Sequence, residues 1–263
     1  RTRVRQPEGR HSLFFRRFFL AARPPGEAPR DHAMDRVRPV PGPTAETGAT
    51  VVAIEVDRGI VPVLREQMAS LENVEVHEAD ATNIDWSNFI TRTNESKGRD
   101  ANAPVAIVAN LPYNIATPLV ADLLDFVPTV QSMLVMVQAE VGHRFCAKPS
   151  DEAYGAVSVK VAYWATAEVV GSVPPTVFLP RPKVDSALVR IRRHATPPVS
   201  GVVPSQLFDL VRAGFAKRRK MLRSALAGTV TAEQFEVAHI DSTARAEQLS
   251  LDDWARLCRA VRA

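Results

Sequence analysis

The sequence predicts an α/β protein, in which a mostly parallel sheet carries helices on both faces and a small helical domain follows. Strand-like and helix-like apolar patterns alternate between residues 49 and 147, and this order builds parallel sheets. Only helical patterns follow Pro197 and Pro198. With 263 residues, 46% hydrophobic and 24% charged, the chain has the composition of a soluble globular protein.

The elements of the α/β region follow from the apolar periodicity of the chain. We predict strands at residues 51–57, 74–80, 105–110 and 132–138, and helices at residues 59–71, 118–126 and 140–147. Two later β-rich runs, residues 168–173 and 186–192, would add an antiparallel edge to the sheet. The helical domain would contain helices at residues 205–215, 218–226, 232–238 and 251–261.

The first 45 residues give no periodic signal. They contain ten Arg and seven Pro, and neither a period of 2 nor one of 3.6 persists. We therefore predict an irregular or disordered tail over residues 1–45, an α/β domain over 46–196 and a helical domain over 197–263. An organelle transit peptide and a stretch read out of frame are the alternative interpretations of the tail.

Charge is divided unevenly along the chain. Residues 46–180 contain 8 basic and 17 acidic residues, whereas residues 181–223 contain 11 basic and 2 acidic residues. A basic segment beside an acidic domain is typical of proteins that bind a polyanion. The pattern predicts nucleic acid as the partner.

Other classes of protein have little support in the sequence. The two cysteines, Cys146 and Cys258, have no ligand or disulfide spacing, and the six His residues are scattered, so we expect no metal site. No apolar stretch approaches the roughly 18 residues of a membrane span. We expect an intracellular, cytoplasmic monomer.

Polar residues end three consecutive predicted strands. Glu55 or Asp57 ends the first, Asp80 the second and Asn110 the third. Because parallel strands end at one edge, these side chains should line one crevice, where open α/β sheets bind ligands. Carboxylates there could accept ribose hydroxyls and an adenine amine, which predicts a nucleoside site. Solvated strand-end acids or helix caps are the alternative.

The tetrad from Asn110 to Tyr113 suits chemistry on an aromatic amine. Such an amine is a poor nucleophile because its lone pair is delocalised, and the Asn110 side-chain carbonyl with the adjacent backbone carbonyl could orient it. Pro112 fixes the turn, and Tyr113 offers a face for a base. The amine would then be held in line with an electrophilic methyl group. A proline turn with a core tyrosine is the alternative.

Two basic segments could contact nucleic acid. Around Pro180 and Pro182 the backbone should be extended, so that Phe178 reaches the crevice while Arg181 and Lys183 meet phosphate. A proline-rich connector is the alternative. Further on, one predicted helix would present five cations beside a buried apolar face, although a merely solvated face would look the same. These cations are Lys217, Arg218, Arg219, Lys220 and Arg223.

Several blocks together resemble one known family, the ribosomal RNA adenine N6,N6-dimethyltransferases. The matching blocks are residues 110–114, Val137, Gln138, Glu140 and Val141, residues 154–159 (YGAVSV), 175–190 (PTVFLPRPKVDSALVR) and 215–222 (FAKRRKML). The resemblance runs from about Thr47 to Leu257. It implies a Rossmann-like class I methyltransferase sheet that uses S-adenosyl-L-methionine to modify two adjacent adenines near the 3′ end of small-subunit (16S) ribosomal RNA, in ribosome biogenesis.

The resemblance also implies roles for individual residues. Glu55 would hold the cofactor ribose and Asp80 the cofactor adenine, with Ala81, Asn110 and Leu111 completing the cofactor-binding set. Asn110 would orient the target amine, and Tyr113 and Phe178 would bracket the flipped target base. No metal or covalent intermediate is implied.

One feature of the family is absent from the matching region. The family begins with a strand, a Gly-rich loop and a helix, and we find no counterpart before residue 46 beyond a faint echo at Gly42 and Pro43. Two other functions therefore stay open. One is an rRNA-binding assembly factor without a complete cofactor site, and the other is a large-subunit rRNA adenine methyltransferase of the resistance type.

Overall fold

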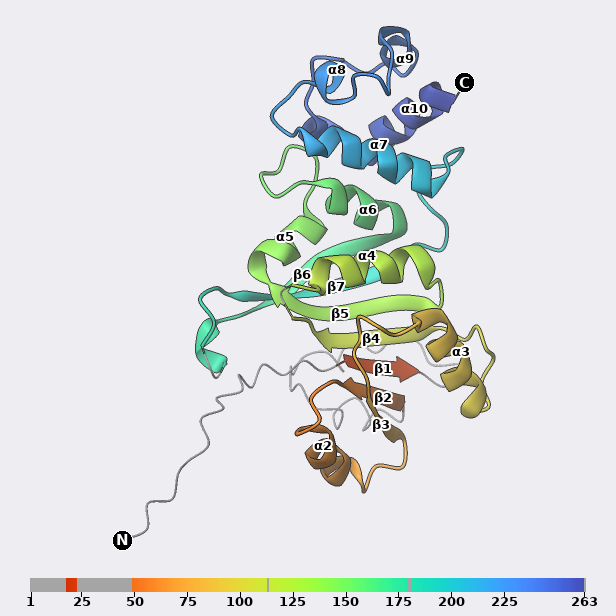
Figure 1. The fold of residues 1–263 in the computed structure, drawn as a ribbon, viewed down its shortest axis with the longest axis vertical. Coiled ribbons are helices and arrows are strands. Elements are labelled where there is room, and N and C mark those ends of the chain that lie inside the picture. Colours follow the sequence, from red (N-terminus) through yellow and green to blue (C-terminus); the bar gives the residue numbers. More distant parts are fainter. Residues whose placement is uncertain (1–17, 23–48, 113, 179–180, 263) are drawn as a thin grey trace.

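The computed structural model describes residues 18–22, 49–112, 114–178 and 181–262, and these form a seven-stranded sheet, its covering helices and a helical domain (Figure 1). The strand order is β3-β2-β1-β4-β5-β7-β6. The strands are β1 Phe18–Ala22, β2 Thr50–Glu55, β3 Val74–Glu78, β4 Val105–Asn110, β5 Val130–Gln138, β6 Ala165–Val173 and β7 Ser186–Arg193.

Strands β2 to β5 run in one direction. The pairs β2·β3 and β4·β5 are parallel, and β1 is antiparallel to both β2 and β4. Their carboxyl ends therefore meet at one rim of the sheet, as the sequence predicted. Strand β7 pairs antiparallel with β5 and β6, which confirms the predicted antiparallel edge.

Strand β1 corrects the prediction of a tail without regular structure. Residues 18–22 form an interior strand of the sheet between β2 and β4, in register with both, where Phe18 pairs with Ile54 and Ala109 (Figure 1). Without a strand here, β2 and β4 would leave buried backbone N–H and C=O groups unpaired. The five-residue apolar run FFLAA supplies the backbone partners for β2 and β4. It is too short and too uniformly apolar to show the alternation that identifies a strand from sequence. The sheet centre is consequently mixed instead of parallel.

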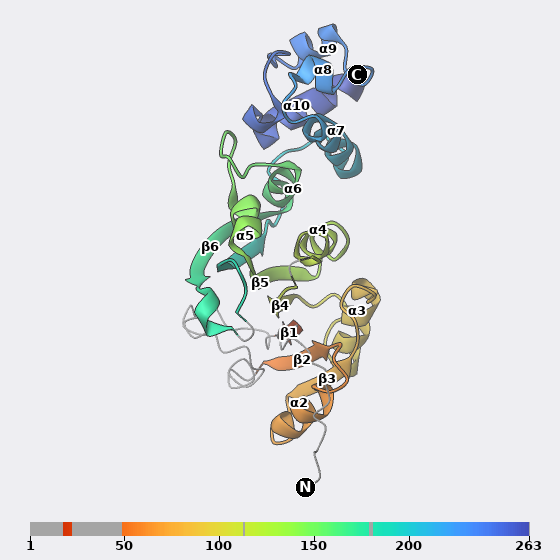
Figure 2. The same ribbon diagram turned by 60° about the vertical axis from the view of Figure 1, so that its left-hand side comes forward.

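Helices cover both faces of the sheet. They are α2 Val61–Met68, α3 Trp86–Ser96, α4 Ala116–Phe126, α5 Ala139–Cys146 and α6 Ala156–Trp164. The side chains of α3 to α6 share one core with the sheet, while α2 packs on the other face against Val51 and Ala53 of β2. Figure 2 shows α3 and α4 along the same side. Helices α3 and α6 were not predicted from the sequence.

The carboxyl-terminal region has a second core. Its elements are α7 Pro204–Ala216, α8 Leu222–Ala225, α9 Ala232–Val237, the 3-10 turn η3 Ala246–Gln248 and α10 Leu251–Arg262. The core surrounds the fully buried Trp254, and Tyr154, Val159 and Tyr163 in and beside α6 also contribute to it. Helix α6 therefore joins the two cores.

The helix predicted at residues 218–226 is wrong. Helix α7 ends at Ala216, residues 217–220 form a turn, and α8 contains only Leu222–Ala225. The Lys220 N–H donates to the Lys217 carbonyl at 2.7 Å, which closes a turn after α7 instead of continuing the helix. Among the helices described, none has the length and apolar character needed to cross a membrane.

Candidate functional site

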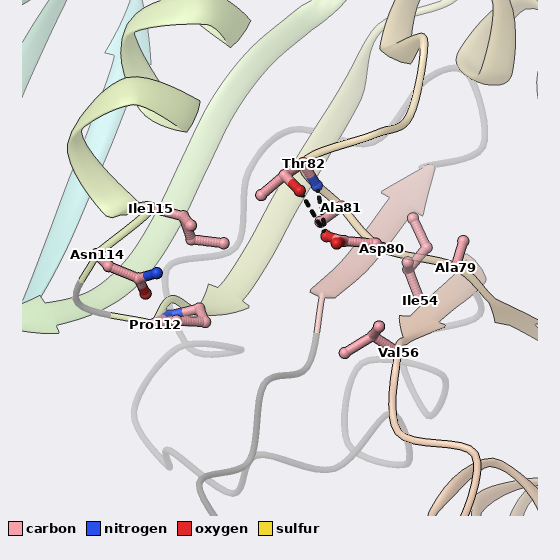
Figure 3. Close-up of a pocket in the computed structure, with 9 residues that line it drawn as sticks. All are labelled: Ile54, Val56, Ala79, Asp80, Ala81, Thr82, Pro112, Asn114 and Ile115. Atoms are coloured by element: carbon pink, nitrogen blue, oxygen red, sulfur yellow. Dashed lines mark hydrogen bonds between the residues drawn. The ribbon is translucent and has the colours of Figure 1, made fainter.

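A cavity of about 200 Å³ lies at the rim where β2 and β4 end and where the chain leaves β3 (Figure 3). One wall comes from the ends of β2 and β3 and the other from the segment between β4 and α4. The lining residues are Ile54, Val56, Ala79, Asp80, Ala81, Thr82, Pro112, Asn114 and Ile115. The cavity is therefore at the edge of the sheet where the sequence predicted a nucleoside site.

Asp80 and Ala81 line the cavity as expected. The Asp80 carboxylate accepts hydrogen bonds from the Thr82 backbone N–H (2.9 Å) and hydroxyl (2.8 Å), which hold it in place (Figure 3). Ala81 is buried, and its carbonyl accepts a 3.0 Å hydrogen bond from the Trp86 indole. This wall thus combines a fixed negative charge with a small apolar surface.

Glu55 lies beside the cavity but does not line it. Its side chain is 1% exposed, and Oε1 accepts hydrogen bonds of 2.9 Å from the backbone N–H groups of Val56 and Asp57. Its chain neighbours Ile54 and Val56 form the cavity wall instead. The predicted contact of Glu55 with a ribose stays a prediction.

Asn110 ends β4 on the other side of the rim. It is half-buried in register with Met136, and within the described ranges its amide makes no side-chain hydrogen bond. The next residue, Leu111, is 2% exposed and continues the pairing through its N–H to the Met136 carbonyl (3.0 Å). Its predicted cofactor contact is untested. Tyr113 lies outside the described residues.

Pro112 connects the tetrad to α4. Its carbonyl accepts 3.1 Å hydrogen bonds from the N–H groups of Ile115 and Ala116, which begins the helix immediately after the motif. Pro112, Asn114 and Ile115 form the second wall of the cavity (Figure 3). The apolar lining residues Ile54, Val56 and Ile115 were not predicted as site residues, because apolar side chains at strand ends resemble ordinary core residues.

Phe178 lies in the connection between β6 and β7. It follows the 3-10 turn η2 Pro175–Val177 and is half-buried, and its own backbone is extended. Pro180, around which we predicted extended backbone, lies outside the described residues. Arg181 and Lys183 are exposed in the same connection. None of the three lines the cavity, so the predicted stacking and phosphate contacts stay predictions.

The predicted RNA-binding cations of the helical domain lie in and after the turn at residues 217–220. Lys217, Arg219 and Lys220 are exposed. Arg223 is exposed on α8. Hydrogen bonds from Thr243 lower the pKa of Asp241, and the positive charge of Arg223 makes a smaller contribution in the same direction. Arg218 differs from these residues because it is hydrogen bonded within the protein.

Across the part of the chain that the structure describes, no three His, Cys, Asp or Glu side chains are grouped closely enough to bind a metal ion. The polar side chains at this rim include the carboxylates of Glu55 and Asp80 and the amides of Asn110 and Asn114.

The sheet, the cavity at its rim and the appended helices define a Rossmann-like methyltransferase fold. The 23S rRNA methyltransferase ErmE shares this fold, with a TM-score of 0.60 at 22% identity over 81% of this chain and 82% of that one. A dimethyladenosine transferase from Plasmodium falciparum matches with a TM-score of 0.60 at 20% identity, over 78% and 79% of the two chains.

Sequence comparison identifies the family. Residues 43–262 match the family model described as "Ribosomal RNA adenine dimethylase", and the chain belongs to this family. Proteins named "Ribosomal RNA small subunit methyltransferase A" are similar to it. The Cutibacterium acnes protein is 44% identical, over 82% of this chain and 73% of that protein. The Thermosynechococcus vestitus protein is 40% identical, over 88% of each. The resemblance seen in the motifs is thereby confirmed.

Proposed function

We propose that this protein transfers methyl groups from S-adenosyl-L-methionine to the N6 amines of two adjacent adenines near the 3′ end of small-subunit rRNA. The observation that carries the proposal is the cavity at the ends of β2, β3 and β4, which Asp80 and the segment from Pro112 to Ile115 border. The substrate of the protein would be the immature small ribosomal subunit, and the protein would act as a monomer in the cytoplasm.

The residues of the cavity fit the nucleoside part of the cofactor. A cavity of about 200 Å³ suits a purine nucleoside, with Ile54, Val56 and Ile115 as apolar walls. Asp80 would accept from the adenine amine, and Glu55 would accept from the ribose hydroxyls. The methionine part would extend toward the start of β1, where Phe18 pairs with Ile54.

Catalysis would consist mainly of positioning. The Asn110 side-chain carbonyl and the backbone carbonyl beside it would accept hydrogen bonds from the target amine and direct its lone pair. When bound, the cofactor would supply an electrophilic methyl group, and these two carbonyls would hold the amine in line with it. Tyr113 and Phe178 would hold the extruded base by stacking, worth about 1–3 kcal/mol per base.

The two alternative functions have less support. The similar proteins at 40% and 44% identity carry small-subunit names, whereas the 23S rRNA methyltransferase ErmE is 22% identical. The cavity that Asp80 borders supports a cofactor site over an assembly factor that lacks a complete one.

Calorimetric titration with S-adenosyl-L-methionine tests the cofactor site. We expect saturable binding that Asp80→Ala weakens about tenfold to a hundredfold, because a hydrogen bond to a charged group contributes about 1.5–3 kcal/mol. Glu78→Ala is the matched control, since this acid near the same rim pairs with exposed Arg58 and lies outside the cavity. Absence of binding at millimolar cofactor would refute the proposed enzyme, and an equal loss in both variants would refute the role of Asp80.

A further inference from the structure

We infer that Arg218 is a positioning residue that locks the basic turn, residues 217–220, to the junction between the two cores. In this role it sets the distance from the RNA-contacting cations to the methyl-transfer crevice and so helps to select the adenine that is modified. The inference rests on the proposed function and assigns Arg218 a role other than direct phosphate contact.

The guanidinium of Arg218 makes two hydrogen bonds to different parts of the protein. Its Nε donates to Oε2 of Glu247 in η3 at 2.7 Å, and its Nη2 donates to the backbone carbonyl of Glu152 at 2.7 Å. Glu152 belongs to the loop that connects α5 to α6, whereas Glu247 belongs to the helical domain. One side chain therefore links three segments that are distant in sequence.

The same junction contains two further hydrogen bonds. The Ser150 N–H donates to the Glu247 carbonyl at 2.8 Å, and the buried Tyr154 hydroxyl donates to the Leu249 carbonyl at 2.9 Å. Burial, followed by the charge of Asp253, raises the pKa of Tyr154, so its hydroxyl keeps the proton at neutral pH. The loop after α5 and the η3 turn thus form a fixed base, and Arg218 attaches the basic turn to that base.

The other cations of the basic turn, unlike Arg218, have no ion-pair partner among the described residues. Lys217, Arg219 and Lys220 are exposed, and within the described residues none of them forms an ion pair. The turn itself is closed by the Lys220 N–H to the Lys217 carbonyl at 2.7 Å. Three cations are therefore presented for phosphate while Arg218, whose side chain is 49% exposed, is held by protein acceptors.

The junction connects directly to the rim of the sheet. Strand β5 ends at Gln138, α5 follows at Ala139–Cys146, and the loop that accepts from Arg218 comes next. A helix of eight residues spans about 12 Å. Phosphates bound at the basic turn would consequently lie at a fixed distance from the crevice. Loss of the Arg218 contacts would leave RNA binding largely intact and would blur the choice of adenine.

Glu247 gives a test in which positioning and phosphate contact predict opposite results. Removing an acid near the basic turn should strengthen or preserve RNA binding if Arg218 contacts phosphate, because Arg218 would be released. If Arg218 positions the turn, Glu247→Ala should impair methylation as Arg218→Ala does. The double variant should be no worse than either single variant, since both remove one interaction.

The experiment measures methylation of immature small subunits and the salt dependence of RNA binding for Arg218→Ala, Glu247→Ala, their combination and Glu247→Gln. Arg219→Ala is the control for a phosphate contact. We expect at least a fivefold fall in kcat/KM and methyl groups on neighbouring adenines for both single variants, with the salt slope unchanged. Arg219→Ala should flatten that slope by about one logarithmic unit.

Normal methylation by Glu247→Ala, together with a flattened salt slope in Arg218→Ala, would overturn the inference. Glu247→Gln keeps the size of the side chain and reports the loss of charge if Glu247→Ala is poorly folded. If the wild-type protein transfers no methyl group, the proposed function fails separately. The inference is then judged by hydrogen exchange in residues 217–220, which should rise in both single variants and would contradict positioning if unchanged.

Discussion

Asn110 carries the chemistry that we propose at the scale of single residues. It ends β4 at the rim, one residue before the buried Leu111, and its backbone is paired in register with Met136. The strand therefore fixes its Cα, and the side chain is the part that can face a substrate amine. Asp80 lies after the end of β3 and is held there by Thr82, so separate segments of the rim hold the two polar groups.

Replacing Asn110 by Ala should abolish methyl transfer and leave RNA affinity within a few fold. In the proposed mechanism the Asn110 side chain orients the target amine, whereas the cations of the basic turn, far from the rim, bind the RNA. Single-turnover methylation and filter binding on the same preparation measure the two effects. Equal losses of both would contradict the role given to Asn110.

Asp253 should control stability at acid pH. Burial opposes its charge, but hydrogen bonds from Ser250 and the pairing with Arg256 lower its pKa below the usual carboxyl value. A lowered pKa stabilises the folded state above the unfolded pKa, and this contribution is lost as pH falls through the folded pKa. Asp253→Asn should therefore destabilise the protein at neutral pH and flatten its loss of stability below about pH 4. Urea denaturation between pH 3 and pH 7 measures this, and parallel curves for both proteins would contradict it.

At the scale of elements, the sequence predicted the helices and strands whose apolar residues recur at the spacing of their buried face. Strand β4 was predicted with its observed bounds because it is one apolar run ending in a polar tetrad. Helix α3 was missed because few of its residues are buried, although Asp85 at its N-cap is a recognisable signal. The predictions for residues 18–22 and 217–220 were wrong, because long-range strand pairing formed β1 and a hydrogen-bonded turn follows α7.

Helices α7 and α10 meet at Gly214, where close packing leaves no room for a side chain. An added Cβ would lie 2.5 Å from Cη2 of the fully buried Trp254. Alanine gains about 1 kcal/mol in helix propensity over glycine, but overpacking a core costs about 1–3 kcal/mol. We expect Gly214→Ala to lower the free energy of unfolding by up to about 2 kcal/mol in chemical denaturation. A stabilised variant would show that α7 can move away from α10.

At the scale of the whole molecule, we propose that the acidic sheet region provides the chemistry and that the basic segment at residues 181–223 docks the RNA. The sequence predicted a nucleic-acid partner from its charge pattern and Asp80 at the crevice from its strand ends, while Ala81 came from the family resemblance; both residues line the cavity. It did not predict the apolar lining or the contacts of Arg218 with Glu247 and Glu152, since those depend on segments distant in sequence.

The exposed cations of the basic turn should dominate the salt dependence of RNA binding. Replacing Lys217, Arg219 and Lys220 together by Ala should reduce the slope of log affinity against log salt by up to about one unit for each lost phosphate contact. Titrations at several salt concentrations measure the slope. An unchanged slope would remove this turn from the RNA interface.

The most direct test of the proposed function uses small and large ribosomal subunits that lack adenine methylation, labelled S-adenosyl-L-methionine and the full-length protein. After reaction, mass spectrometry of RNA fragments locates the label. We predict N6,N6-dimethyladenosine at two adjacent adenines near the 3′ end of the small-subunit rRNA and no label in the large subunit. Label confined to large-subunit RNA, or no transfer to either subunit, would contradict the account.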